Sequence, residues 1–303
     1  MATRIDKRVL RLLTGWALIG SLLSIASGEP SDSPSSGSIE LLTLNSKVFS
    51  NTRTIRVWLP PDYNSPSSKN RKFPVFYFTD GIAVFHGREL DRIASELVAA
   101  HEIPSTIFVG IDNGGSTQES RKPGTDRANE YLPFPDEFLQ PPLPNPHGML
   151  FPAFFEHEVR RLVESRYRTN QEIGIAGSSY GGAIALYTVL KHPKKYRWLL
   201  LESPSLYINH DALLKLSDAQ KAWPRRVYVG AGTDEGEGDS KQEMVNDVER
   251  LGHAIEGRTA TCLFIVRGAQ HNEDAWRARL PRALKFLLAN QPCPSTKTSA
   301  NLP

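Results

Sequence analysis

The stretch Ile173-Gly-Ile-Ala-Gly-Ser-Ser-Tyr-Gly-Gly182 predicts more about this chain than any other. Its apolar first half predicts a short buried strand, and the small residues after it predict a tight turn into a helix that opens at Gly181. The turn contains the pattern G-x-S-x-G with Ser179 at its centre, which places a serine hydroxyl on a strand-to-helix turn where it projects from the fold. A Gly/Ser-rich turn without chemistry would contain the same residues, so the other parts of the chain must distinguish the two.

Strands and helices are expected to alternate on both sides of that turn. Ile55, Val57 and Leu59 alternate with polar residues, which predicts a half-exposed antiparallel hairpin from the segments 39–44 and 54–59. Further strands are expected at 73–79, 106–111, 197–201, 226–230 and 261–266, and helices at 89–100, 151–166, 182–191, 211–221, 241–255 and 274–289, the last kinked or restarted at Pro281. This alternation predicts one α/β domain, with a mostly parallel central sheet, helices on both faces and an N-terminal antiparallel hairpin.

The two ends of the chain differ from this domain, which is expected to span 39–290. Residues 1–28 have a basic start, an apolar run shorter than a membrane span and a small-residue exit, which is typical of a secretory signal peptide. If it were not removed, the same segment would act as a membrane anchor. Residues 29–38 are expected to be a flexible lead-in and 291–303 a disordered tail. The mature protein is therefore expected to be exported, periplasmic or secreted, without stable membrane association.

Charge and cysteine usage exclude several classes of protein. The net charge is +3, and the 28-residue leader, with four basic residues and one acidic residue, accounts for all of it. The mature chain is therefore near neutral and has no basic patch with interleaved aromatics, so no nucleic-acid partner is expected. The spacing of Cys262 and Cys293 does not match a common zinc motif, and no metal or organic cofactor is implied.

His271 is the expected base. A serine hydroxyl is a poor nucleophile until a base takes its proton, and parallel-sheet enzymes of this kind order their groups along the chain as serine, acid, histidine. His271 follows the last expected strand, so it should lie at the same edge of the sheet as Ser179. His192, His210 and His253 also follow the serine, but they lie at helix ends, where surface or capping roles are more typical.

The acid is expected in the loop 230–239, which follows the strand before His271. Asp234 and Glu235 lie closest to the end of that strand and are the two candidates. Asp239 is expected to cap the next helix, and Glu237 lies between glycines as a solvated carboxylate would. The alternative is a solvated acidic loop and an enzyme that uses a Ser-His pair.

An oxyanion hole requires backbone donors directed at the tetrahedral intermediate. One expected donor is the N–H of Tyr180, directly after the serine. The other is expected in the loop Asp80-Gly81-Ile82, which follows the strand 73–79, with the N–H of Ile82 as the donor. Taken alone, Asp80-Gly81 would also be compatible with a simple turn.

Several spaced motifs make the chain resemble a known family. They are the Phe-Thr-Asp80-Gly81 strand end, Arg127-x-x-Glu-Tyr-x-Pro, Tyr167-Arg-Thr, Ala-Gly177-Ser-Ser179-Tyr-Gly-Gly, Glu202-Ser-Pro-Ser, Gly232-Thr-Asp-Glu235 and His271-x4-Trp276-x3-Leu-Pro. Together they resemble the putative esterase family of α/β-hydrolases, a group similar to esterase D and to the trilactone esterases that open enterobactin-type siderophores. The resemblance covers roughly residues 40–290.

The resemblance implies an α/β-hydrolase fold, with Ser179 as nucleophile and His271 as base. It favours Glu235 over Asp234 as the acid, although two adjacent carboxylates leave both candidates open. Arg127 matches a position at which siderophore esterases have a substrate-binding arginine, a role that suits an anionic or catecholate substrate. Pairing of Arg127 with Glu130 is the structural alternative.

These observations lead to one expected function and several alternatives. The first is an exported serine carboxylesterase that acts through an acyl-enzyme on a small-molecule ester, with a siderophore trilactone as the favoured substrate. A carbohydrate-linked feruloyl or acetyl esterase, an acyltransferase and a non-catalytic binding protein are the alternatives. The long polar, Pro-rich segment 112–149 is expected to be a functional loop. The sequence implies no particular oligomeric state.

The expected topology brings the two cysteines to the same end of the domain. Cys262 lies at the start of the last strand, and the final helix returns antiparallel to that strand, so that Cys293 comes back to the same end. A disulfide is therefore feasible and would stabilise the fold by roughly 3 kcal/mol. A buried Cys262 with an unbonded Cys293 is the alternative.

Overall fold

The computed structural model of the protein describes residues 36–114 and 126–293, except 138, 140, 141, 144, 237 and 239. The expected signal peptide, most of the expected lead-in and tail, and the expected roles of Glu237 and Asp239 therefore lie outside the described residues. Within the described ranges, no helix is long and apolar enough to cross a membrane.

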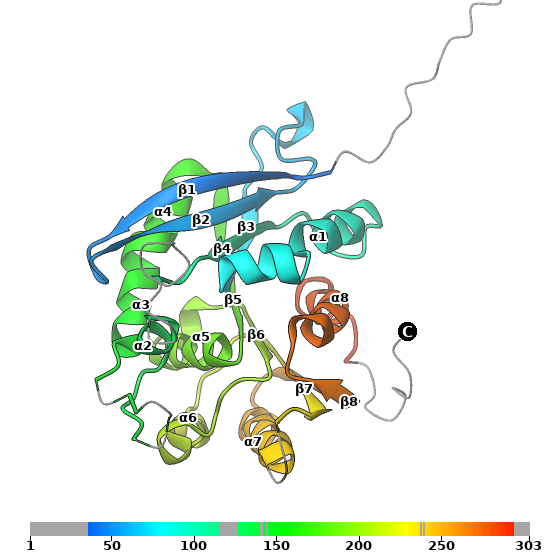
Figure 1. Cartoon of the computed structure of the whole chain (residues 1–303). Helices are drawn as coiled ribbons and strands as arrows, with labels where there is room; N and C mark the ends of the chain where they lie inside the picture. The colour runs from blue at the N-terminus through cyan, green and yellow to red at the C-terminus, as the bar shows by residue number, and fades with distance from the viewer. Residues whose placement is uncertain are drawn as a thin grey trace, which may run out of the picture. The chain divides into compact units, whose positions relative to one another are not determined.

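The described residues form an eight-stranded sheet in the order β1-β2-β4-β3-β5-β6-β7-β8 (Figure 1). The strands are β1 (Ser38–Ser46), β2 (Asn51–Leu59), β3 (Phe73–Thr79), β4 (Ile107–Ile111), β5 (Thr169–Ser178), β6 (Trp198–Glu202), β7 (Arg226–Asp234) and β8 (Ala260–Gln270). β1 pairs antiparallel with β2 and β2 with β4, whereas all other pairs are parallel. The expected mostly parallel sheet with an N-terminal antiparallel hairpin is confirmed.

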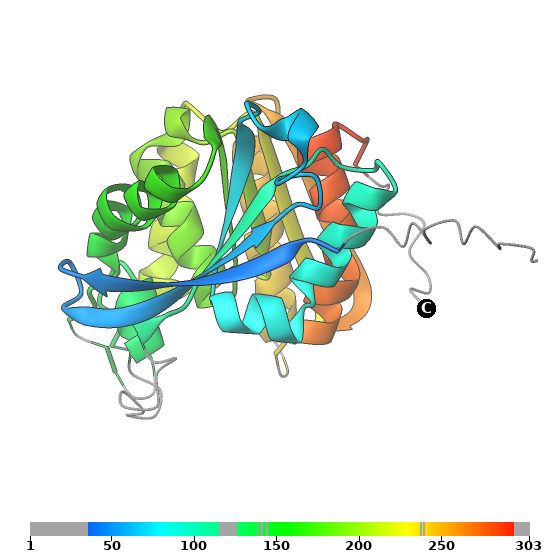
Figure 2. The same ribbon diagram turned by 90° about the horizontal axis from the view of Figure 1, so that it is seen from above.

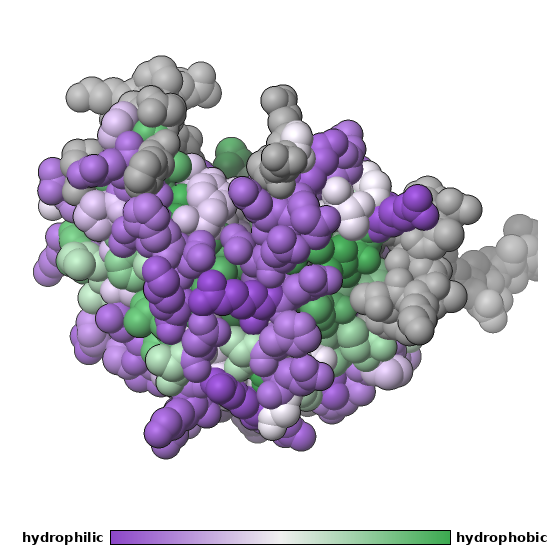
Figure 3. Space-filling view, turned by 90° about the horizontal axis from the view of Figure 1, so that it is seen from below, coloured by the Kyte–Doolittle hydropathy of each residue, from purple (hydrophilic) through white to green (hydrophobic). Residues whose placement is uncertain are grey.

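Helices cover both faces of the sheet, as Figures 1 and 2 show. They are α1 (Leu90–Ala99), α2 (Asp126–Tyr131), α3 (Phe151–Phe154), α4 (Arg160–Arg166), α5 (Tyr180–Lys191), α6 (Ile208–Ala219), α7 (Ser240–Ile255) and α8 (Glu273–Ala289). Leu90 of α1 and Leu284 of α8 pack into the core on one face, and Phe154, Leu186 and Leu251 pack into the core on the other. The side on which α6 and α7 lie is mostly hydrophilic (Figure 3).

Some helices differ from the sequence-based expectation. α2 lies inside the segment 112–149, which was expected to be a loop. The helix expected over 151–166 contains a π-helical turn at Phe155–Val159, a widening that hydrophobic periodicity does not reveal. α8 continues through Pro281, where a kink or restart was expected.

The start of α6 is a further difference. The helix was expected from Asp211, but it begins at Ile208 and contains three consecutive residues with positive φ, Asn209, His210 and Asp211. The backbone N–H of Asn209 donates to Asp136 Oδ2 at 2.9 Å, so a contact with a distant residue holds this turn. Sequence periodicity has no access to such a contact.

The sheet brings the chemistry-bearing residues to one edge. Strands β3, β5, β6, β7 and β8 run parallel, so their carboxyl ends meet at the same edge. Asp80, Ser179, Ser203, Glu235 and His271 each follow the end of one of these strands.

The opposite end of the domain contains a disulfide. Cys262 near the start of β8 is bonded to Cys293 beyond the end of α8, with 5.1 Å between their Cα atoms. The bond therefore joins the last strand to the last helix, as the expected topology allows.

Candidate active site

Ser179 lies on a sharply bent turn between β5 and α5. Its backbone has φ 55° and ψ −129°, a conformation that a residue with a side chain rarely adopts. A Cβ added to Gly177 would lie 2.0 Å from the carbonyl oxygen of Gly181, and one added to Gly181 would lie 2.4 Å from Thr79 Oγ1. Only glycine fits at these two positions, which explains physically why the pattern G-x-S-x-G specifies this turn.

The structure brings Glu235, and not Asp234, to His271. The Nδ1 atom of His271 lies 3.0 Å from Glu235 Oε2. Asp234 is the last residue of β7, and its carboxylate forms a partly exposed ion pair with Lys241. Successive residues of an extended chain point to opposite sides, so the two adjacent carboxylates separate into one surface group and one buried group.

Several donors surround the buried Glu235 carboxylate, which is 1% exposed. Its Oε1 atom accepts hydrogen bonds from Ser203 Oγ and from the backbone N–H of Gly232, both at 2.6 Å. Burial by itself would raise the pKa of Glu235, but the hydrogen bonds from His271 and Ser203 and the charge of Arg279 outweigh it. They hold the pKa below its usual value, so the group carries a negative charge at neutral pH.

Ser179 and His271 line one pocket of about 630 Å³. Its other lining residues are Tyr180, Ser205, Tyr207, Glu235, Gly236, Glu243, Met244 and Asp247. Among the described residues, Ser179 Oγ is within hydrogen-bond distance of Ser205 Oγ, at 3.5 Å, and not of His271. Hydrogen bonds between nucleophile and base are often long without substrate and shorten in the substrate complex.

The two expected oxyanion donors lie at the ends of neighbouring strands. Tyr180 is the first residue of α5, so its N–H belongs to the first turn of the helix and has no intrahelical acceptor. Ile82 directly precedes the π-helical turn Ala83–Gly87 that follows β3, and β3 pairs with β5. Both N–H groups therefore lie at the sheet edge where Ser179 is found.

Arg127 pairs with Asp80, which corrects the alternative pairing with Glu130. Its Nε and Nη2 atoms donate to the two carboxylate oxygens of Asp80, each at 2.7 Å, and Nη2 also lies 3.4 Å from the carbonyl oxygen of Ser178. Glu130 instead pairs with the buried Arg53 of β2 at 2.7 Å. Arg127 is not among the residues that line the Ser179 pocket, although its side chain remains 33% exposed.

Sequence reasoning missed several pocket and network residues. Ser203 contacts Glu235, and Ser205, Tyr207 and Met244 line the pocket. The motif Glu202-Ser-Pro-Ser was a signal for the two serines, but it did not indicate what they contact. No local pattern marks Tyr207 or Met244, which reach the pocket through the packing of α6 and α7.

Comparisons with known proteins identify the family of the chain. The model of the putative esterase family matches residues 46–287. The uncharacterized protein YbbA of Bacillus subtilis is 23% identical over 246 residues, which cover 78% of this chain and 92% of YbbA.

Two solved structures share the fold. The siderophore hydrolase EstB from Aspergillus nidulans matches with a TM-score of 0.69 at 20% identity, covering 85% of this chain and 98% of its own. An IroE-like serine hydrolase from Shewanella oneidensis also matches at 0.69, with 18% identity and coverage of 84% and 81%. On the family match, the chain belongs to the putative esterase family of α/β-hydrolases and is a carboxylic ester hydrolase.

Proposed function

We propose that the protein hydrolyses its ester by a serine mechanism. Ser179 Oγ attacks the ester carbonyl while His271 takes the hydroxyl proton. The C–O bond to the alcohol then breaks, the alcohol leaves with that proton, and an acyl-enzyme remains. Water, deprotonated by His271, attacks the acyl carbon, and Ser179 departs with its proton restored.

One observation carries this proposal: the hydrogen bond between His271 and Glu235 in the pocket that contains Ser179. A carboxylate at Nδ1 keeps the proton on that nitrogen, so that Nε2 is free to act as the base. The same carboxylate stabilises the imidazolium that forms during the attack. The N–H groups of Tyr180 and Ile82 are the proposed donors to the oxyanion.

The proposed substrate is a siderophore trilactone ester. The pocket volume of about 630 Å³ is in the range typical of small-molecule sites. Tyr180 and Tyr207 supply aromatic surface on which a catechol ring could stack. The name of EstB, a siderophore hydrolase with the same fold, supports the same class of substrate.

Ser179→Ala tests the mechanism. The variant should remain folded, should not react with a fluorophosphonate probe and should lose at least ~10³-fold in turnover of a p-nitrophenyl ester. Near-normal turnover would reject the serine mechanism, and failure of the native protein to react with the probe would favour a non-catalytic binding protein.

A screen of the native enzyme tests the substrate. A trilactone should be opened faster than a feruloyl sugar or an acetylated sugar. Faster cleavage of either sugar ester would replace the siderophore assignment, and an acylated sugar acceptor among the products would indicate transfer in place of hydrolysis.

Export is part of the proposal. The disulfide between Cys262 and Cys293 supports it, because such bonds persist in oxidising compartments. Mass spectrometry of the mature protein should find an N-terminus near residue 29, and an intact Met1 would contradict export by a cleaved leader.

A further inference from the structure

Ser203 connects the parts of the proposed catalytic site that lie on different strands. Its hydroxyl donates to Glu235 Oε1 at 2.6 Å. Its backbone carbonyl accepts a hydrogen bond from the N–H of Ser179 at 3.2 Å, and its own N–H donates to the carbonyl of Gly230 in β7 at 2.7 Å. Ser203 is fully buried and has a φ of 46°. The residue is therefore held in place by both the nucleophile turn and the strand that leads to the acid.

The neighbours of Ser203 determine the direction in which its hydroxyl proton points. Trp276 Nε1 donates to Ser203 Oγ at 2.9 Å, and Arg279 Nη2 donates to it at 3.3 Å. Both groups can only donate, so they occupy the two lone pairs of the hydroxyl oxygen. The one hydroxyl proton must then point to Glu235 Oε1, which leaves Oε2 to face His271.

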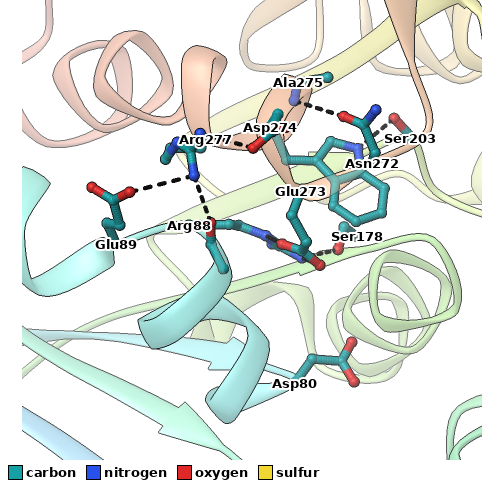
Figure 4. A network of polar contacts seen from close by, with 12 residues as sticks. Asp80, Arg88, Glu89, Ser178, Ser203, Asn272, Glu273, Asp274, Ala275 and Arg277 are labelled. Carbon is teal, nitrogen blue, oxygen red and sulfur yellow. Dashed lines mark hydrogen bonds and ion pairs between the residues drawn. The ribbon is translucent and has the colours of Figure 1, made fainter.

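Trp276 is itself held between charged and aromatic groups. The Arg88 guanidinium lies 4.8 Å from the centre of the Trp276 ring, and the ring of His271 meets it edge-on at 5.0 Å. Arg88 also donates to Ser178 Oγ at 2.5 Å and pairs with Glu273. Figure 4 shows Arg88 reaching Ser178 beside Glu273, with Ser203 on the far side of the same network.

We propose that Ser203 and Trp276 act as a positioning pair that fixes the orientation of the Glu235 carboxylate toward His271. This inference rests on the proposed serine mechanism. Neither residue touches the reacting atoms. Trp276 sets the direction of the Ser203 hydroxyl, and Ser203 fixes which oxygen of Glu235 is presented to the imidazole. Loss of either should slow the chemical step and leave substrate binding nearly unchanged.

A double-mutant cycle tests the pair. Ser203→Ala should lower kcat by roughly 10- to 100-fold with KM within about threefold, because a hydrogen bond to a charged group is lost. Trp276→Phe keeps an aromatic ring at this position but is smaller and lacks the indole N–H, and it should lower kcat by roughly 3- to 10-fold. If Trp276 acts through Ser203, the double variant should be no slower than Ser203→Ala alone.

A second readout separates positioning from general damage to the fold. The acid limb of the pH profile of kcat should move to higher pH in Ser203→Ala, because Glu235 has lost a donor to its charged form. Ser217→Ala is the matched control: it removes an equally buried hydroxyl, which donates to the carbonyl of Leu213 in α6, and should change neither kcat nor the pH profile.

The outcomes are distinguishable. Unchanged kcat in Ser203→Ala, a loss confined to KM, or additive losses in the double variant would overturn the positioning pair while the serine mechanism remained intact. An active Ser179→Ala variant would overturn the mechanism itself. Trp276→Phe could lower kcat while the acid limb of the pH profile stays in place in Ser203→Ala. That combination would mean that the two residues support the fold and do not position Glu235.

Discussion

Two arginine–carboxylate ion pairs lie on opposite flanks of Ser179. They have the same N–O distance but differ in how far they are exposed to solvent. On the flank of β6 to β8, Arg279 and Glu202 lie 2.7 Å apart and their side chains are 0% and 2% exposed. On the flank of β3 and α2, Arg127 and Asp80 also lie 2.7 Å apart, but the Arg127 side chain is 33% exposed. The first pair can only hold protein groups in place, whereas the second can also meet a ligand.

The charged groups on the two flanks act differently on the site and on a substrate. Burial would lower the pKa of Arg279, but the charge and hydrogen bond of Glu202 together with the charges of Tyr228 and Glu235 outweigh it and raise the pKa, so Arg279 remains a cation that supports Ser203 and Glu235. The pocket on this side is lined by two further carboxylates, Glu243 and Asp247. We therefore expect an anionic substrate to be repelled from the α7 side of the pocket, whereas Asp80 balances the charge of Arg127 on the other flank.

The largest effect is expected from the buried flank. Glu235→Gln keeps the shape of the side chain and removes its charge, and it should lower kcat by roughly 10³- to 10⁴-fold, as the loss of a triad carboxylate does in serine proteases. Asp234→Asn is the matched control, since its carboxylate pairs with Lys241 at the surface, and it should stay within about twofold of the native rate. Equal losses in the two variants would remove the distinction between these neighbours.

Removal of the disulfide tests whether the end of the domain opposite the site affects catalysis. The bond lies beyond the end of α8, the helix that carries Trp276 and Arg279. Cys262→Ala combined with Cys293→Ala should lower the free energy of unfolding in urea by about 3 kcal/mol. It should change kcat by less than about twofold, because the bond is at the opposite end of the domain. A large fall in kcat would mean that the bond also places Trp276 and Arg279.

Arg127→Ala tests the exposed flank. If Arg127 binds an anionic acyl group, KM for a catecholate ester should rise by about tenfold or more, because a hydrogen bond to a charged partner is lost. KM for a neutral p-nitrophenyl ester should change by less than about threefold. Arg127→Lys keeps a positive charge beside Asp80, so its KM for the catecholate ester should lie between that of the native protein and that of Arg127→Ala. A loss of equal size on both esters would assign Arg127 a structural role alone.

The smallest effect is expected from Asp247. Burial, with the charge of Asp211 adding to it, raises the pKa of Asp247 to about 6. The carboxylate therefore gains its charge as the pH rises through about 6, and KM for an anionic ester should then rise by up to about fivefold relative to a neutral ester. Asp247→Asn should abolish this difference, and its persistence in the variant would assign the repulsion to another group.

The raised pKa of Asp247 also makes the stability of the folded protein depend on pH. The folded-state pKa of Asp247 lies above the ordinary value of 3.8, so ionisation disfavours the native state as the pH rises from about 4 through 6. Asp247→Asn should therefore have a higher Tm than the native protein at pH 8, and the difference should vanish at pH 4.

The sequence predicted most strands correctly because their signals are local. The apolar runs of β3 and β4 predicted buried parallel strands, and the alternation in β2 predicted its half-exposed hairpin. The sequence did not predict the π-helical turn at Phe155–Val159, because hydrophobic periodicity does not reveal it. It also did not predict the left-handed turn at the start of α6, because that turn depends on Asp136, more than seventy residues away.

By itself, the sequence determined the bend at Ser179 and the edge at which His271 would lie. Glycine spacing and chain order suffice for both, since each depends on a few consecutive residues and on parallel strands. Tertiary structure alone decided that Glu235 and not Asp234 meets His271, that Arg127 pairs with Asp80, and that Ser203 and Trp276 meet across 73 positions. Which side chains meet across strands depends on how the sheet and its helices pack, and no single stretch of the chain contains that information.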